Sequence, residues 1–396
     1  MNMSELLRFL GEQTSPSRNA GHRHILTFRN PAHYQEFLHD LKLGRPEWGE
    51  SLPVYSTALI QGIVCKLESE DLPLRFRRAL SVEEDTAVQL HGLPTQERHV
   101  NPGIPWGVRR VRAPEIWSTS TGHQVRIGVV DTGVDFHHPD LKYSLARGVN
   151  LLSRMAWPID DNGHGTHIAG TIAGAGAPDG LTGVAPRSVI YPVKAFDHNG
   201  AAYVSDIIRG IDWCIYNRIQ IINMSFGMKK KSTAMEDVVI RATEAGVVIV
   251  ASAGNDKKKK SIDYPARLPQ TIAVGASNRE RRIAPFSNNG SFVDIYAPGD
   301  QIRSAWLGGK YKRMNGTSMA TSHVSGAIAL LLAQSPGLIP AEIKTMLQET
   351  SRPLVLADKA KSAPGEIDAF KLVKKHTNQT VTSVKRKPKA PSKRSE

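Results

Sequence analysis

The sequence contains little cysteine and no long apolar run. Only two of the 396 residues are cysteine, Cys65 and Cys214, which argues against a disulfide framework; we expect both thiols to pack as small apolar groups. The longest apolar runs, "GVVIVASAG" and "AIALLLAQ", fall far short of the roughly 20 residues that a membrane span needs. The opening "MNMSELLRFLGEQTSPSRN" shows neither the apolar core nor the small-residue cleavage site of an export signal. The sequence therefore predicts a cytoplasmic protein without a membrane span, with secretion by an unrecognised route as the alternative.

Acidic residues are fewer than basic ones, and the net charge is +14. Such a balance can indicate a nucleic-acid partner. Much of the excess, however, lies in the last residues, 374–396, which end in "KRKPKAPSKRSE" and lack aromatics and apolar periodicity. We therefore predict a basic disordered tail that is solvated, with contact to a polyanion as the alternative. Without aromatic or helix-based recognition features, we expect no specific nucleic-acid partner. We also expect the protein to be a monomer.

The first hundred residues read as a small α+β unit with flexible flanks. Residues 1–21 are predicted to be a flexible N-terminus. Within 22–91, "HRHILTFR" and "ALIQGIVCKLES" have the apolar pattern of strands, and "PAHYQEFLHDLK" between them has helical spacing. "DLPLRFRRAL" is a second helix candidate and "TAVQL" a final strand, which gives the order β-α-β-α-β. Residues 92–103 are rich in proline and glycine and are predicted to be a linker.

Residues 104–373 alternate apolar strands with helices. Continuous Val and Ile runs such as "QVRIGVVD", "IQIINMSFG" and "GVVIVASAGN" are separated by helical segments such as "VSDIIRGIDWCIYN". This alternation predicts an α/β unit with a mostly parallel sheet and helices on both faces. In such sheets the chemistry gathers at the carboxyl ends of the strands.

Four residues at strand ends or helix starts could carry that chemistry: Asp131, His164, Asn255 and Ser318. Each has a simpler explanation when taken alone. Asp131 and Asn255 could serve as turn residues, and Ser318 as a helix N-cap. The spacing of His164 and His167 resembles half a zinc site, but no third ligand accompanies them at ligand spacing.

The order of these residues favours a joint role, because Asp–His–Ser is a known chain order of the hydrolytic triad. The surrounding motifs are "VVDTGVDFHHPDL", "DDNGHGTHIAGTIAG", "INMSFG", "ASAGN", "FSNNGSFVDIYAPG" and "NGTSMATSHVSG". In this order they resemble the subtilisin family (subtilases, peptidase family S8) of serine proteases. The resemblance runs from about residue 104 to 373 and implies the subtilisin-like fold.

The resemblance implies a role for each of these residues. Asp131 would orient His164, which would take the proton of Ser318 as that serine attacks the scissile carbonyl to form an acyl-enzyme. The side-chain amide of Asn255 would stabilise the oxyanion. The substrate would pair as an added strand along edges that include Gly200, Ser225, Phe226 and Gly227.

The resemblance also implies that residues 22–91 form a ferredoxin-like propeptide that inhibits the enzyme until the chain cuts itself. By the same resemblance, Asp263 would occupy the base of the primary specificity pocket, so we hypothesise a preference for Arg or Lys before the cut. The alternative is an exposed Asp263 neutralised by the lysines of 257–260. A basic preference would make Arg98 a natural maturation site; the other candidate lies near His91.

Two positions bear on features that are common in the family. No cofactor is needed for the chemistry, but a structural calcium is common, and Asp140 matches one ligand position. Within the loop 175–181, Ala177 stands where an amide ligand is expected. Ser322 stands where the family usually has a proline, and we expect a trans bond before it. The competing hypotheses are a pseudoprotease with the same fold and a nucleic-acid-binding protein.

Overall fold

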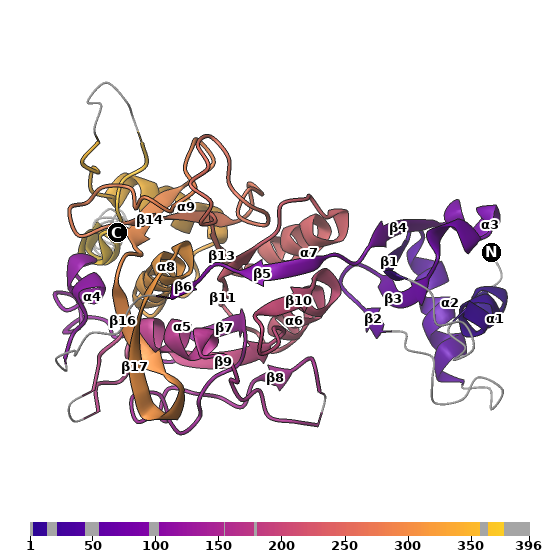
Figure 1. Cartoon of the computed structure of the whole chain (residues 1–396), viewed down its shortest axis with the longest axis horizontal. Helices are drawn as coiled ribbons and strands as arrows, with labels where there is room; N and C mark the ends of the chain where they lie inside the picture. The colour runs from indigo at the N-terminus through magenta and orange to yellow at the C-terminus, as the bar shows by residue number, and fades with distance from the viewer. Residues whose placement is uncertain are drawn as a thin grey trace, which may run out of the picture.

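The computed structural model describes residues 3–13, 22–43, 55–94, 103–153, 155–177, 180–356 and 363–375. They form a small N-terminal unit and a larger α/β unit. An extended segment, residues 87–94, leads from the first unit onto the second (Figure 1). No helix in these ranges is both long and apolar enough to cross a membrane.

The N-terminal unit is a four-stranded antiparallel sheet with the order β2-β3-β1-β4. Together with its helices, this order is that of the ferredoxin-like β-α-β-β-α-β motif. Its α-helices and β-strands are α1 (Met3–Gln13), β1 (His22–Phe28), α2 (Pro31–Lys42), β2 (Tyr55–Thr57), β3 (Gly62–Leu67), α3 (Leu74–Arg77) and β4 (Leu80–Glu84).

The prediction of a flexible N-terminus is wrong for residues 3–13. They form α1, and its apolar side chains recur at helical spacing and are buried in the core of the unit: Met3, Leu6, Leu7 and Leu10. The pattern spans less than three turns of helix, and its stability comes from packing against that core rather than from the segment itself.

The predicted final strand of this unit is also assigned differently in the structure. The sheet closes with β4, whereas β5 (Ala87–Leu90) leaves the unit and pairs with strands of the larger one. The segment "ALIQGIVCKLES" was predicted as one strand. Its first residues instead form the turn of a tight hairpin between β2 and β3, in which Gln61 adopts a left-handed conformation (φ 51°), and β3 follows.

The larger unit is built on a seven-stranded sheet in which every pairing is parallel, with the order β15-β14-β13-β11-β7-β9-β8. This confirms the predicted α/β class. The strands are β7 (Arg126–Asp131), β8 (Val149–Asn150), β9 (Val189–Lys194), β11 (Ile221–Met224), β13 (Val248–Ser252), β14 (Ile272–Ser277) and β15 (Ile295–Pro298).

Helices cover both faces of this sheet. One apolar core holds residues of α5 (His164–Ala173) and α8 (Thr317–Leu332), and another holds residues of α6 (Val204–Tyr216) and α7 (Thr233–Glu244). Because β7, β11 and β13 are buried on both faces, their sequences are mostly apolar rather than alternating. The remaining helices of this unit are α4 (Trp106–Arg110) and α9 (Pro340–Thr350).

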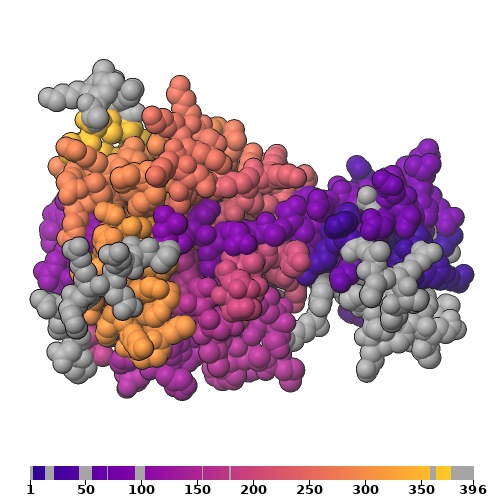
Figure 2. Space-filling view, in the orientation of Figure 1, coloured from indigo at the N-terminus to yellow at the C-terminus, as the bar shows by residue number. Residues whose placement is uncertain are grey.

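Two small sheets connect the extended segment to the larger unit. β5 lies between β10 (Ala201–Tyr203) and β12 (Phe226–Gly227) and is antiparallel to both. β6 (Leu93–Pro94) then pairs with β17 (Lys310–Asn315), which forms a hairpin with β16 (Ile302–Trp306). Figure 2 shows this violet segment at the surface of the larger unit, between chain segments of other colours. Residues 87–94 therefore run across the carboxyl-end region of the main sheet.

Candidate active site

Asp131 and His164 form a buried pair. Asp131 ends β7, and His164 is the first residue of α5. The Nδ1 atom of His164 lies 2.8 Å from Oδ1 and 2.9 Å from Oδ2 of Asp131. Because a carboxylate only accepts, Nδ1 carries the proton. The Nε2 atom is buried without a hydrogen-bond partner among the described residues, so its lone pair is available to accept a proton.

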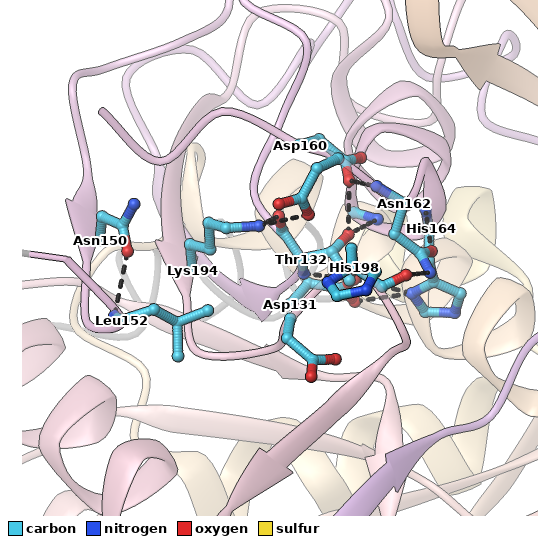
Figure 3. Close-up of polar contacts among 12 residues, drawn as sticks. Asp131, Thr132, Asn150, Leu152, Asp160, Asn162, His164, Lys194 and His198 are labelled. Carbon is cyan, nitrogen blue, oxygen red and sulfur yellow. Dashed lines mark hydrogen bonds and ion pairs between the residues drawn. The ribbon is translucent and has the colours of Figure 1, made fainter. Parts of the chain in front are cut away.

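A second carboxylate, Asp160, supports this pair and was missed in the sequence. Its Oδ1 accepts from the backbone N–H of Gly163 at 2.8 Å and from Thr132 Oγ1 at 2.8 Å, and its Oδ2 accepts from Thr166 N at 2.9 Å. Asp160 thus caps the helix that begins with His164 and holds the residue that follows Asp131 (Figure 3). The pair Asp160 and Asp161 just before "NGHGTH" was the available signal.

Lys194 is another buried charge beside the pair. It ends β9 and is 4% exposed, and its Nζ donates to Thr132 O at 2.6 Å and to Asp161 Oδ1 at 2.7 Å. β9 pairs directly with β7, and Lys194 lies opposite Asp131 in that pairing. The turn after Asp131 is therefore held by a side chain from the neighbouring strand as well as by Asp160 (Figure 3).

Ser318 is the second residue of α8 and is fully buried. Its Oγ donates to Ser225 O at 3.0 Å, and its own carbonyl accepts from Ser322 Oγ at 2.9 Å. Ser322 thus replaces the family proline with a hydroxyl that bonds inside the helix. The bond before it is not among the cis peptide bonds of the described residues, in agreement with the expectation.

Asn255 follows β13, and its side chain connects α8 to the extended segment. Its Oδ1 accepts from Thr317 N and Thr317 Oγ1, both at 3.0 Å. These contacts orient the amide so that Nδ2 donates to the carbonyl oxygen of His91 at 2.6 Å. The His91 carbonyl therefore lies where an oxyanion donor would act.

Gly92, the next residue, packs against the ring of His164. A Cβ built on Gly92 would lie 2.6 Å from Cδ2 and 2.9 Å from Nε2 of His164, so no larger residue fits there without movement. The peptide bond between His91 and Gly92 thus passes between Asn255 and His164. The other maturation candidate, Arg98, lies outside the described residues.

The strand edges named from the sequence meet the extended segment. Leu90 N donates to Gly200 O at 3.3 Å, and His91 N donates to Ser225 O at 3.1 Å. Phe226 and Gly227 form β12, which pairs with Leu90 and Gln89. All four predicted substrate-edge residues therefore line the path of residues 87–91.

Asp263 lies under the side chain of His91. Its Oδ2 is 3.2 Å from His91 Nε2 and 2.6 Å from Lys229 Nζ. The alternative of an exposed Asp263 is wrong, because the side chain is only 2% exposed. Burial opposes its ionisation, but hydrogen bonds from His91 and Lys229 outweigh burial and lower the pKa of Asp263 below its ordinary value.

Asp140 does not fit the predicted calcium site. Its oxygens accept from Ala177 N at 2.9 Å, Leu181 N at 3.0 Å and the hydroxyl of Tyr311 at 2.8 Å. Three donors aimed at one carboxylate compete with a cation, which needs oxygen ligands on all sides. Among the residues that the structure describes, no group of three His, Cys, Asp or Glu is arranged to hold a metal.

Comparison with known proteins identifies the family. Residues 122–384 match the model of the subtilase family. The chain belongs to the subtilases. It is 43% identical over 253 residues to subtilisin of Bacillus pumilus, which covers 63% of this chain and 91% of that protein. It is therefore a serine-type endopeptidase of peptidase family S8.

Two further relatives show how far the similarity extends. Subtilisin E of Bacillus subtilis is 42% identical over 253 residues, or 63% of this chain and 66% of that protein. The alkaline protease of Alkalihalobacillus alcalophilus is 34% identical over 356 residues, or 87% of this chain and 90% of that protein. An alignment of that length is longer than residues 104–396 can supply, so it extends into the N-terminal unit of this subtilase.

The comparisons also correct the expected location. The cytoplasmic location predicted from the sequence is wrong, because the subtilisins to which this subtilase is similar are secreted proteases.

Proposed function

We propose that this subtilase hydrolyses peptide bonds through Asp131, His164 and Ser318, with the oxyanion stabilised by the side-chain amide of Asn255. His164 takes the proton of Ser318 Oγ at Nε2, while Asp131 holds the opposite nitrogen and stabilises the imidazolium. Ser318 forms the acyl-enzyme, and His164 returns the proton to the leaving amine. The free Nε2 beside Gly92 and the bonded Nδ1 support this division of roles.

We further propose that the chain is a zymogen that cuts itself after His91. The observation that carries this proposal is the 2.6 Å hydrogen bond from Asn255 Nδ2 to the carbonyl of His91. The carbonyl thus lies where charge develops in acyl transfer, and the following Gly92 adjoins the general base. Residues 87–90 hold the bond there by pairing as a strand.

The N-terminal unit would remain bound after the cut and inhibit the enzyme, because its last strand occupies the substrate edges. Polypeptides would replace this strand as substrates. Since the relatives are secreted, we infer that these polypeptides lie outside the cell. The preference for Arg or Lys before the cut stays a prediction from the sequence alone, and the pairing of Asp263 with Lys229 opposes it.

N-terminal sequencing and active-site labelling test this proposal. The processed protein should begin at Gly92, and a fluorophosphonate probe should label it. Ser318→Ala should abolish both labelling and cutting, whereas Ser325→Ala, in the same helix but bonded to Asn223 at 2.8 Å, should retain both. A first processed residue of His99 would contradict the cut site, and cutting by the Ser318→Ala chain would contradict the triad.

A further inference from the structure

The imidazole of His91 is held at both nitrogens. Nε2 lies 3.2 Å from Asp263 Oδ2, and Nδ1 lies 2.7 Å from Ser252 Oγ. Since the carboxylate only accepts, Nε2 carries a proton, and Nδ1 pairs with the Ser252 hydroxyl, which also lies 3.3 Å from Phe226 O. His91 is only 8% exposed, so each nitrogen depends on these protein partners rather than on water.

The walls around the ring are close. A Cβ added at Gly227 would lie 2.1 Å from Cε1 of His91, and one added at Gly254 would lie 2.6 Å from Asp263 Oδ2. Gly227 therefore lets the backbone lie against the imidazole, and Gly254 leaves room for the carboxylate that reaches it. The space fits a planar ring with a polar atom at each end.

Lys229 already neutralises the carboxylate at the base. Its Nζ lies 2.6 Å from Asp263 Oδ2 and also pairs with Asp256, and Lys258 Nζ lies 3.8 Å from Asp263 Oδ1. A substrate Arg or Lys would have to displace Lys229 to reach Asp263, because both cations need the same oxygens. The imidazole instead shares the carboxylate with Lys229, as His91 does.

We propose that this pocket selects histidine as the residue before the cut, with Asp263 and Ser252 as the specificity-determining residues and Lys229 as the group that disfavours Arg and Lys. This inference rests on the proposed function, since it names the side chain that the same site accepts. A pocket that hydrogen-bonds a polar side chain discriminates strongly against an apolar one that leaves those groups unpaired.

Self-cleavage of the full chain is the first test. Rates would be measured by gel and mass spectrometry for the wild type and for His91→Leu, His91→Phe and His91→Arg. We expect each variant to be cut at least about tenfold more slowly than the wild type. His39→Leu, which changes an exposed histidine of α2, is the matched control and should be cut at the wild-type rate.

Variants of the pocket residues distinguish a loss of histidine recognition from a general loss of cleavage activity. Asp263→Asn should slow the cut after His91 but leave the already slow cut of the His91→Leu chain within about threefold, because leucine makes no bond to Asp263. Lys229→Met should speed the cut of the His91→Arg chain, since it frees the carboxylate. A merely structural role for Asp263 would slow all chains alike and would overturn the assignment.

Quenched peptides complete the test with the activated enzyme. The sequence AVQL-X-GLP, which follows residues 87–94, would be offered with X as His, Phe, Leu, Lys or Arg, and kcat/KM should be highest for His. Equal or faster cleavage after Leu, Phe, Lys or Arg would overturn the inference while the proposed function stands. Failure to cut any peptide, together with failure of the fluorophosphonate to label Ser318, would instead overturn the proposed function.

Discussion

Two side chains of the proposed reaction centre, those of Asn255 and His164, are held in place by residues that take no part in the reaction. Asn255 uses its oxygen to bind Thr317 and leaves only its N–H groups for the cleft. Asp160 caps the helix that carries His164. The orientation of the donor and of the base is thus fixed before substrate arrives, which is the condition for electrostatic stabilisation of an oxyanion.

Removing the amide donor gives a direct prediction. Asn255→Ala should lower kcat by about 10²–10³-fold with little change in KM, since the bond strengthens as charge develops on the oxygen; that magnitude was measured in subtilisin itself. Steady-state kinetics with a peptide substrate would measure the loss. Asn255→Asp keeps an acceptor for Thr317, so an equal loss in this variant assigns the effect to the donor, whereas retained activity would contradict it.

Buried histidines outside the proposed triad predict a loss of stability in acid. Burial lowers the pKa of His323 from 6.5 to about 4, and burial also lowers the pKa of His167 to about 3. The fold favours the neutral rings. Their full contribution to stability is therefore present above about pH 6.5 and is lost as the pH falls toward those values.

His323→Asn should flatten this dependence. Between pH 7 and pH 4.5, protonation of His323 in the unfolded chain lowers the free energy of unfolding of the wild type by about 2–3 kcal/mol. The variant has no imidazole at this position and should not lose this amount. Urea unfolding of the uncut Ser318→Ala chain at pH 7, 5.5 and 4.5 would measure the difference. His39→Asn, at an exposed position, should follow the parent curve; an unchanged slope in His323→Asn would refute the argument.

At the scale of elements, α1 and β5 differ most from their predicted assignments. Helical spacing of apolar residues was present at Met3, Leu6, Leu7 and Leu10. A helix this short is not stable by itself, however, so the pattern alone did not distinguish a helix from a flexible chain end. The pattern of β5 predicted a strand correctly, yet not its partners, because the pattern records burial and not which sheet provides it.

Packing of α1 should contribute to the stability of the N-terminal unit. Leu7 is fully buried, so Leu7→Ala should cost about 2–5 kcal/mol and slow self-cleavage, because a less stable unit presents β5 less often. Circular dichroism of the uncut Ser318→Ala chain in urea would report the loss. Arg8→Ala, on the exposed side of the helix, should change little; equal effects of the two would contradict the packing role.

At the scale of the whole molecule, carboxylates of the N-terminal unit cap helices of the larger one. Asp85 Oδ1 accepts from Ser205 N at 2.9 Å at the start of α6, and Glu83 Oε2 accepts from Thr233 N at 3.0 Å at the start of α7. Arg23 donates to Asp85 at 2.8 Å and to Ser205 Oγ at 2.7 Å. These contacts connect the two units in addition to the paired strand.

Weakening this contact should release activity sooner. Asp85 is buried and holds both Ser205 and Arg23, so Asp85→Ala should loosen the cut N-terminal unit by about tenfold to a hundredfold. The measurement is the delay between self-cleavage and the appearance of peptidase activity in the full-chain preparation. Glu84→Ala, an exposed neighbour on β4, should keep the wild-type delay; an unchanged delay in Asp85→Ala would contradict the inhibitory role of the contact.

The sequence by itself determined the α/β class, the parallel strands and the family, because continuous apolar runs and the motifs around Asp131, His164 and Ser318 are local properties. Only the tertiary structure decided what surrounds Asp263. Lys229 and His91 are far from Asp263 along the chain, and their contacts with it depend on how separate loops and the N-terminal unit pack. Asp140 shows the same dependence, since its match to a calcium ligand is local while the donors that fill its oxygens come from two distant segments.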